Sequence, residues 1–427
     1  MIKIIKDKLT NRDEIFSAVM EKVDVSATVK EIIEKVRREG DAALYYYCEK
    51  FDKAKLSSLR VSEEEISEAL LSVEPEFIEI LKEAAENIRE FHKNQKNDGF
   101  TLKKTDGIVI GQKVIPVDRA GLYVPGGTAA YPSTVLMDAI PAKIAGVGRV
   151  VMVTPPDKNG KVNPVILAAA SVAGVDEIYK VGGAQAIAAL AYGTETVPKT
   201  DKIVGPGNAY VAEAKRQVYG EVSIDMIAGP SEIMIVADKN NRAKDIAADL
   251  LSQAEHDRMA SAVLVTDSED FANRVSAELE KQIPMLERCE IARASIDNYG
   301  KIIVTDSIEN AIEVANGIAP EHLELCLDDP FYYLDKVRHA GSVFLGRYCP
   351  EALGDYFAGT NHTLPTSGTA KFSSPLSVDD FVKKTQFIYY DREALSAVAR
   401  KVEYFAKKEG LTAHAKSAVV RLESTDE

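Results

Sequence analysis

The chain has 427 residues, of which 46% are hydrophobic and 28% are charged, and its formal net charge is −14. This length predicts two or three domains, and the composition is ordinary for a globular protein. The acidic balance argues against a general nucleic-acid-binding protein or a protein of anionic membrane surfaces, because both need a basic surface. The sequence also lacks the run of about 18 apolar residues that a membrane-spanning helix needs, so we expect no membrane partner.

The four cysteines, Cys48, Cys289, Cys326 and Cys349, form no CxxC pair. The sequence therefore indicates neither a zinc ribbon nor a disulfide framework. The N-terminal residues contain no long apolar region with a cleavage site, so no secretory leader is indicated. We expect the protein to work in a reducing cytoplasm.

Residues up to about 100 are predicted to be mostly helical. Ser26 can cap an amphipathic helix that ends at Gly40. Pro75 suits the first turn of another helix with a continuous apolar stripe. His92 lies beside that stripe, and we expect it at the surface or the rim.

From about residue 101 onward, short apolar runs alternate with Ala-rich helical runs. The predicted strands are Val114–Val117, Gly121–Val124, Val150–Val153, Glu177–Val181, Lys202–Val204, Glu232–Val236, Ala262–Val265, Ile302–Val304, Ser342–Leu345 and Gln386–Tyr390. Strands alternating with helices predict an α/β fold with two parallel-sheet, Rossmann-like domains. Ligands of such sheets gather at the carboxyl ends of the strands, where several of these runs end in glycine.

The glycine fingerprint of dinucleotide-binding loops is absent. After Gly205 and Gly207, for example, Tyr210 occupies the position of the third glycine. A dinucleotide would therefore need another loop, and Tyr123–Gly127 is the best candidate, with an aromatic ring followed by glycines that admit a close ligand. The same residues also fit a strand that ends in a tight turn.

Gln253 and His256 close a predicted helix that begins near Arg242. Residues three apart emerge from one side of a helix, so both side chains can point to one place. An amide oxygen and an imidazole aimed at one point can hold a borderline metal or a polar ligand. The other interpretation is a histidine favoured by the dipole at a helix C-terminus.

Two further segments carry residue types that suit catalysis. Glu321 and His322 place a carboxylate beside an imidazole, which can supply two bases near neutral pH if burial tunes them. A surface ion-pairing dipeptide is the alternative. Asp355, in a loop flanked by Gly354 and Gly359, can ligate a metal or hold its own backbone in a turn.

Several segments together resemble the histidinol dehydrogenases. They are Arg119–Gly127, Val204–Asn208, Ala228–Glu232, Asp249–His256, Ala319–Leu323, Gly359–His362 and Glu409–His414. The resemblance runs from near residue 20 to near residue 418, in family order. It implies a zinc-dependent, NAD-linked, four-electron oxidation of L-histidinol to L-histidine through L-histidinal, the last step of histidine biosynthesis.

The resemblance also implies roles for individual residues. The implied zinc ligands are Gln253, His256, Asp355 and His414, and the implied acid/base pair is Glu321 and His322. The implied substrate contacts are Ser231, Gln253, His256, His322, Asp355, Glu409 and His414, and the implied NAD contacts are Tyr123, Gln185 and Asn208. No catalytic position departs from the family pattern. Asp257 and Arg258 do differ from it, but they lie beside the ligands.

The family is a homodimer in which the C-terminal tail crosses to the partner, so Glu409 and His414 are expected in the neighbour's site. The expected organisation begins with an N-terminal segment, 1–19. A first α/β domain, 20–122 and 231–376, carries most zinc and catalytic residues, and a second α/β domain, 123–230, binds NAD. A dimerisation tail, 377–427, ends the chain.

Two other functions remain open. One is a related zinc- and NAD-dependent dehydrogenase of another small alcohol, such as a sulfonated propanediol. Glu409 argues against it, because a carboxylate suits a cationic amino-alcohol and opposes a sulfonate. The other is a metal- or nucleotide-binding module without turnover, which NADH production from histidinol would exclude.

Overall fold

The structure is a computed structural model that describes residues 2–6, 24–105, 107–126, 130–227 and 229–423. The chain divides into two compact units: unit 1 is Met1–Gln95 with Val117–Phe381, and unit 2 is Lys96–Pro116 with Val382–Glu427. Most of the expected segment 1–19 lies outside the described residues, as do Gly127 of the expected dinucleotide loop and Ala228 of a family motif. None of the described helices combines the length and apolar character that crossing a membrane requires.

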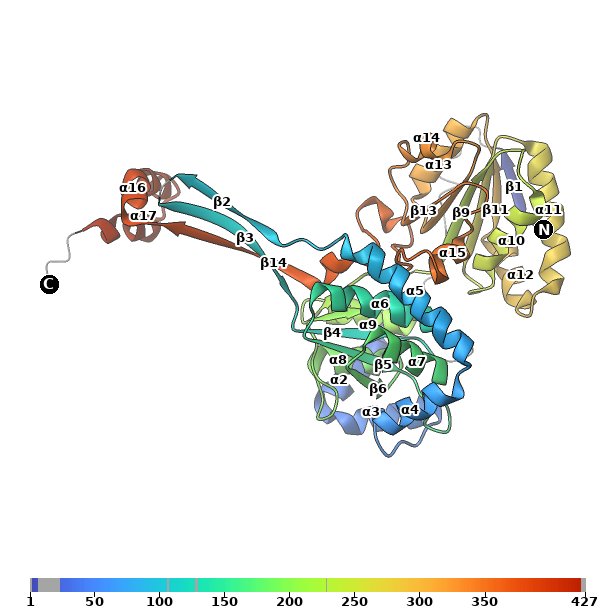
Figure 1. Ribbon diagram of the computed structural model, residues 1–427, viewed down its shortest axis with the longest axis horizontal. Coiled ribbons are helices and arrows are strands. Elements are labelled where there is room, and N and C mark those ends of the chain that lie inside the picture. Colours follow the sequence, from blue (N-terminus) through green and yellow to red (C-terminus); the bar gives the residue numbers. More distant parts are fainter. Residues whose placement is uncertain (1, 7–23, 106, 127–129, 228, 424–427) are drawn as a thin grey trace. The chain divides into compact units, whose positions relative to one another are not determined.

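The first sheet of unit 1 has five parallel strands in the order β6-β5-β4-β7-β8 (Figure 1). Their bounds are β4 Arg119–Tyr123, β5 Arg149–Thr154, β6 Glu177–Lys180, β7 Lys202–Val204 and β8 Ser223–Ile224. The chain builds outward from β4 to β6 and then returns to the other side of β4. The strand order therefore reverses between β4 and β7, and the carboxyl ends of these two strands flank a switch point where ligands bind in such sheets.

Helices cover both faces of this sheet. One face carries α4 Glu63–Ser72, α5 Pro75–Lys93, α6 Pro132–Ala145 and α7 Pro164–Ala173. The other carries α2 Ser26–Glu39, α3 Asp41–Tyr47, α8 Gly183–Tyr192 and α9 Ala209–Val218. Leu122 of β4 belongs to the first core and its neighbour Tyr123 to the second, as strand alternation requires.

The helices α2–α5 thus pack with the sheet of residues 119–224, whereas the expected boundaries grouped 20–122 with 231–376. The reason is physical. An amphipathic stripe indicates that a helix buries one face, but it carries no information about which sheet covers that face.

The second sheet of unit 1 has six parallel strands in the order β1-β11-β10-β9-β12-β13. Their bounds are β1 Lys3–Lys6, β9 Glu232–Ala237, β10 Ser261–Thr266, β11 Lys301–Val304, β12 His322–Cys326 and β13 Ser342–Leu345. On one face lie α10 Ala243–Ala254, α11 Glu269–Gln282 and α12 Cys289–Asn298, and on the other α13 Ile308–Ile318 and α14 Pro330–Leu334. From β9 onward, the strand order repeats that of the first sheet.

The prediction of an α/β fold with two parallel sheets is confirmed. The expected strands Lys202–Val204 and Ser342–Leu345 match β7 and β13. The expectation for His92 is wrong, because its side chain is buried and its Nδ1 lies 2.7 Å from Gln95 Oε1. Its place beside the apolar stripe of α5 gave no sign of this polar partner.

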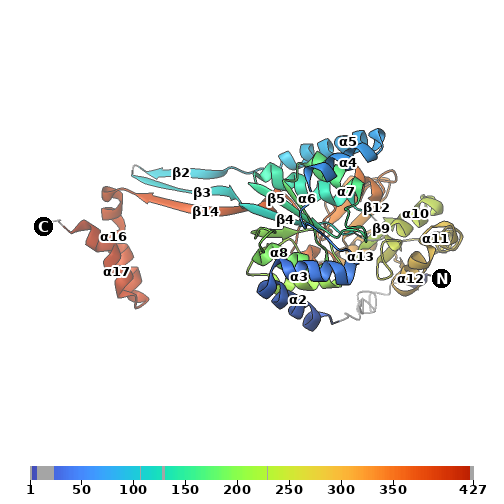
Figure 2. The same ribbon diagram turned by 90° about the horizontal axis from the view of Figure 1, so that it is seen from below.

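Unit 2 contains an antiparallel sheet in the order β14-β3-β2 and a helical hairpin (Figure 2). The bounds are β2 Gly99–Thr105, β3 Ile108–Pro116, β14 Val382–Tyr390, α16 Arg392–Lys408 and α17 Thr412–Val419. Large apolar side chains of this unit are exposed, among them Phe100, Ile388 and Phe405. Exposed apolar side chains gathered on a small unit are typical of a surface that another chain covers.

Candidate active site

A cluster of ionisable side chains lies at the amino ends of β9 and β12. His322 is the first residue of β12, Glu321 directly precedes it, and Glu232 is the first residue of β9. The two strands are neighbours, with His322 paired to Ile233. This edge is opposite to the carboxyl edge at which ligands of parallel sheets are expected.

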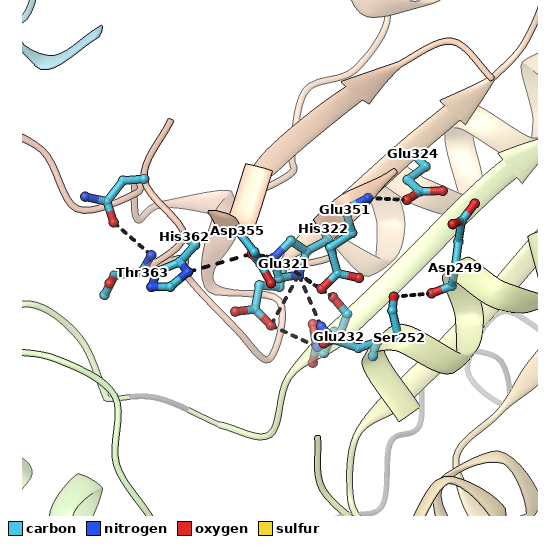
Figure 3. A network of polar contacts seen from close by, with 12 residues as sticks. Glu232, Asp249, Ser252, Glu321, His322, Glu324, Glu351, Asp355, His362 and Thr363 are labelled. Carbon is cyan, nitrogen blue, oxygen red and sulfur yellow. Dashed lines mark hydrogen bonds and ion pairs between the residues drawn. The ribbon is translucent and has the colours of Figure 1, made fainter. Parts of the chain in front are cut away.

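The two ring nitrogens of His322 face different surroundings. Nδ1 lies 3.0 Å from the backbone oxygen of Glu232 and 3.2 Å from Gln253 Nε2. Nε2 lies 3.7 Å from Glu351 Oε1 and 3.8 Å from Asp355 Oδ1. A proton on Nδ1 satisfies the carbonyl oxygen, so Nε2 is the nitrogen that faces the acidic side of the cluster. Figure 3 shows these side chains converging.

The carboxylates around His322 are held by a short helix, α15 Glu351–Tyr356. Glu324 shares a face of β12 with His322, and its Oε1 accepts a hydrogen bond of 2.8 Å from the backbone N–H of Glu351. This bond anchors the first residue of the helix. Glu351 and Asp355 are four residues apart, so both point to the same side, toward His322.

Burial and mutual repulsion shift the pKa values of these groups. Burial raises the pKa of Glu321 to about 8 and that of Glu351 to about 7. Burial lowers the pKa of His322, but the charges of Glu351 and Glu321 outweigh it and raise the value to about 10. Burial likewise opposes ionisation of Asp355, yet the interaction with the nearby His322 ring holds its pKa below the usual value.

The donor atoms of this cluster fit a divalent metal ion. Ligand atoms of His322, Glu351 and Asp355 lie within 4.8 Å of one another. Within the described residues, buried Gln253 Oε1, His322 Nε2 and Glu351 Oε2 have no hydrogen-bond partner. Buried polar atoms without a partner are rare, and nitrogen and oxygen donors together suit a borderline ion such as zinc.

The structure brings several of the sequence-predicted site residues to this cluster. Gln253, in the last turn of α10, contacts His322, and Asp355 does so from α15. His256 follows α10, where burial lowers its pKa and the charge of Asp355 opposes that effect. Ser231 directly precedes β9 and Glu232.

The other two predicted residues belong to unit 2. Glu409 caps the C-terminus of α16, and His414 lies on α17. Both side chains are exposed.

The three predicted dinucleotide contacts lie at the carboxyl edge of the first sheet. Tyr123 ends β4, and its hydroxyl oxygen accepts a hydrogen bond of 3.1 Å from the backbone N–H of Gly183, at the start of α8. Asn208 caps α9 with bonds from the backbone N–H groups of Tyr210 and Val211. Gln185, on α8, is buried, and its Oε1 lacks a partner in the part of the chain that the structure describes. Helix N-termini beside an unpaired amide oxygen fit a dinucleotide.

Sequence reasoning missed two residues of the cluster. Glu351 was not singled out, although it follows Pro350 and precedes Asp355 by four residues, a spacing that places both on one face of a helix. His362 was noted without a role, and its Nδ1 lies 3.8 Å from Asp355 Oδ1. Its position in a segment without regular structure offered no periodicity to interpret.

Comparisons with a family model, with related sequences and with solved structures all find the same family. A family model described as histidinol dehydrogenase matches residues 17–422. The chain is 55% identical to a histidinol dehydrogenase of Clostridium acetobutylicum over 99% of both chains, and 57% identical to one of Bacillus cereus over 93% of both. The crystal structure of histidinol dehydrogenase from Elizabethkingia anophelis is similar with a TM-score of 0.95 at 40% identity, covering 100% of this chain and 99% of that one.

Proposed function

The chain belongs to the histidinol dehydrogenase family, and we propose that it oxidises L-histidinol to L-histidine through L-histidinal, with zinc and two molecules of NAD. The observation that carries the proposal is that Gln253 and Asp355 both meet His322. Gln253 Nε2 lies 3.2 Å from Nδ1 of His322, Asp355 Oδ1 lies 3.8 Å from Nε2, and the amide oxygen of Gln253 is unpaired among the described residues. Such a site can hold a cation and an amino-alcohol and can also move protons.

Gln253, His256 and Asp355 would hold the zinc ion, together with His414 of a second copy of the chain. When bound, zinc supplies a template that fixes the imidazole and amine of histidinol, and its charge favours the neutral form of His322. Ser231, at the amino end of β9, and Glu409 of the second copy would complete the substrate pocket. A carboxylate at position 409 favours a cationic amino-alcohol over a sulfonated propanediol.

His322 and Glu321 would carry the two proton transfers. Hydride leaves the alcohol carbon only as the hydroxyl proton is removed, and the Nε2 of a neutral His322 can accept that proton. The aldehyde must then add water before its own oxidation. Glu321 can activate this water, because burial keeps its pKa at about 8, close to neutrality.

Tyr123, Gln185 and Asn208 would contact NAD. Tyr123 and Asn208 flank the switch point between β4 and β7, and Gln185 lies on α8, whose first residue, Gly183, donates to the Tyr123 hydroxyl. The N-termini of α8 and α9 can receive the phosphates. The aldehyde would stay bound while NADH leaves and a second NAD enters.

A homodimer would bring His414 and Glu409 to the site of the other copy. The exposure of both residues supports this arrangement, as do the exposed apolar residues of unit 2. The four cysteines are free thiols, which supports a reducing cytoplasm as the compartment.

The test is absorbance at the NADH band in the presence of NAD and zinc, with histidinol or a sulfonated propanediol as substrate. We expect NADH from histidinol and none from the sulfonate. NADH formed from the sulfonate alone would favour the related dehydrogenase. Binding of zinc and NAD without any NADH formation would indicate a binding module without turnover.

A further inference from the structure

A buried ion pair lies beneath the loop that precedes Asn208. Lys215 of α9 and Asp225 form this pair, with side-chain exposures of 2% and 1%. The backbone N–H of Gly205 donates to Asp225 Oδ2 at 2.8 Å, and Lys215 Nζ donates to the Gly205 carbonyl oxygen at 3.0 Å. Both polar groups of Gly205 are therefore held by charged partners in the interior, which fixes the start of the loop.

The other side of Gly205 packs against Tyr123 and Asp138. A Cβ atom at Gly205 would lie 2.2 Å from the carbonyl oxygen of Tyr123 and 3.0 Å from Asp138 Oδ2. Asp138, on α6, is fully buried. Its Oδ1 accepts a hydrogen bond of 3.0 Å from Thr363 Oγ1. A movement of the loop at Gly205 would therefore displace Asp138, whose side chain contacts Thr363.

Thr363 belongs to a segment, 361–367, that reaches the candidate active site. Asn361 Nδ2 donates to the backbone oxygen of Met137 on α6 at 2.7 Å, and Asn361 Oδ1 accepts from the N–H of Thr363 at 2.9 Å. His362, between these two anchors, faces Asp355 with the 3.8 Å separation given above.

The same segment is also bound to the amino end of β9. The N–H of Ser367 donates to Glu232 Oε1 at 3.0 Å, and the N–H of Glu232 donates to Glu321 Oε2 at 2.9 Å. The connection from the loop beside Asn208 to the residues around His322 therefore has three parts. Gly205 packs against Asp138, Asp138 accepts the hydrogen bond from Thr363, and the segment 363–367 carries on to Glu232 and Glu321.

We propose that Asp138 and Thr363 are positioning residues that couple occupancy of the dinucleotide site to the placement of His362 and Asp355. This inference rests on the proposed function, in which two dinucleotides are exchanged while one substrate stays bound. Chains of packed side chains and hydrogen bonds can carry energetic coupling between two separate sites. Such coupling is reciprocal, so it is measurable as a change in dinucleotide affinity when substrate binds.

The test uses a pair of ligands that cannot react, NADH and L-histidinol, on the zinc-loaded full chain. The dissociation constant of NADH is measured by fluorescence titration with and without saturating histidinol, and the ratio of the two constants is the coupling. We expect a ratio that differs from one by about fivefold or more in the unmodified protein. Thr363→Val should bring the ratio close to one, and Thr363→Ser, which keeps the hydroxyl, should retain it.

Thr200→Val is the matched control. Thr200 is also buried, with 1% exposure against 7% for Thr363, and its Oγ1 donates to the Leu190 carbonyl oxygen at 3.0 Å, away from the network. Thr200→Val should lose stability as Thr363→Val does, but its ratio of NADH dissociation constants should equal that of the unmodified protein. A ratio of one in the unmodified protein, an unchanged ratio in Thr363→Val, or an equal loss in Thr200→Val would each overturn the coupling. Failure of NADH or histidinol to bind at all would instead overturn the proposed function and this inference with it.

Discussion

At the scale of single residues, His322 and Glu321 are expected to have different tasks. His322 faces Glu351 and Asp355 through Nε2, whereas Glu321 Oε2 accepts the N–H of Glu232 at 2.9 Å. Both side chains contact the backbone of Glu232, but Nε2 of His322 also faces two carboxylates from α15. Adjacent residues with different partners can serve different proton transfers.

We expect His322→Asn to slow both oxidations, because each releases a proton that needs a base. Glu321→Gln should mainly slow the oxidation of histidinal, by about 100-fold or more, since only that step needs activated water. Single-turnover rates with histidinol and with histidinal separate the two steps. Equal losses on both substrates in Glu321→Gln would refute the division of roles.

Asp138 makes stability depend on pH. Burial, and next the charge of Asp225, raise the pKa of Asp138 well above its ordinary value near 3.8. The folded protein therefore binds a proton that the unfolded chain has released, so this residue's contribution to stability is lost as pH rises from the unfolded value through the folded one. Asp138→Asn keeps Oδ1 and should flatten the fall of Tm as the pH rises above the ordinary Asp value near 3.8. The same fall in both proteins would contradict this assignment.

At the scale of elements, the conformation of the loop between β7 and α9 depends on Gly205. Its φ of +114° suits glycine, and a Cβ there would meet the Tyr123 carbonyl oxygen at 2.2 Å. Gly220 is a matched comparison, with φ +103° and nothing within 4 Å of a built Cβ. Gly220→Ala should cost only the backbone strain, about 1–3 kcal/mol.

Gly205→Ala should carry the same backbone strain and must also displace β4 or the loop. We therefore expect it to lose NADH binding and to have a lower Tm than Gly220→Ala. Thermal unfolding and NADH titration of both variants measure the difference. Identical behaviour of the two variants would show that the contact with Tyr123 does not constrain the loop.

The apolar strands were predictable from sequence, whereas the strand that carries the site was not. β9 is a continuous apolar run, but β12 alternates His322 and Glu324 with two leucines, a pattern that also fits a surface strand. Glu351 was missed for a related reason, because α15 spans only Glu351–Tyr356 and so is too short to show periodicity. The site also lies at the amino edge of its sheet, whereas ligands of parallel sheets are usually expected at the carboxyl ends of the strands.

At the scale of the whole molecule, the two sheets of unit 1 share one strand order from β4 and β9 onward but carry their candidate functional residues at opposite edges. Tyr123 and Asn208 lie at the carboxyl edge of the first sheet, and Glu321 and His322 at the amino edge of the second. The alternation of strands and helices predicted both sheets. Which of the two sheets packs against α2–α5 depends on contacts between distant segments, and no local sequence pattern encodes these contacts.

A site shared between two copies has a clear consequence for mixed dimers. His322→Asn and His414→Asn should each be inactive as pure proteins. In a mixed dimer, one of the two sites combines an intact His322 with an intact His414 from the other chain. After denaturation and joint refolding, about a quarter of the normal activity should therefore return. No recovery from the mixture, with recovery of the unmodified protein as control, would contradict a shared site.

A four-electron oxidation of L-histidinol must yield two NADH for each histidine, and this stoichiometry can be measured. Limiting L-histidinol is incubated with zinc-loaded protein and excess NAD, and NADH and histidine are both quantified. We predict two NADH and one histidine per histidinol, and no turnover after removal of the metal with a chelator, while circular dichroism shows an unchanged fold. One NADH per histidinol with released histidinal, or full turnover in the metal-free protein, would contradict the account.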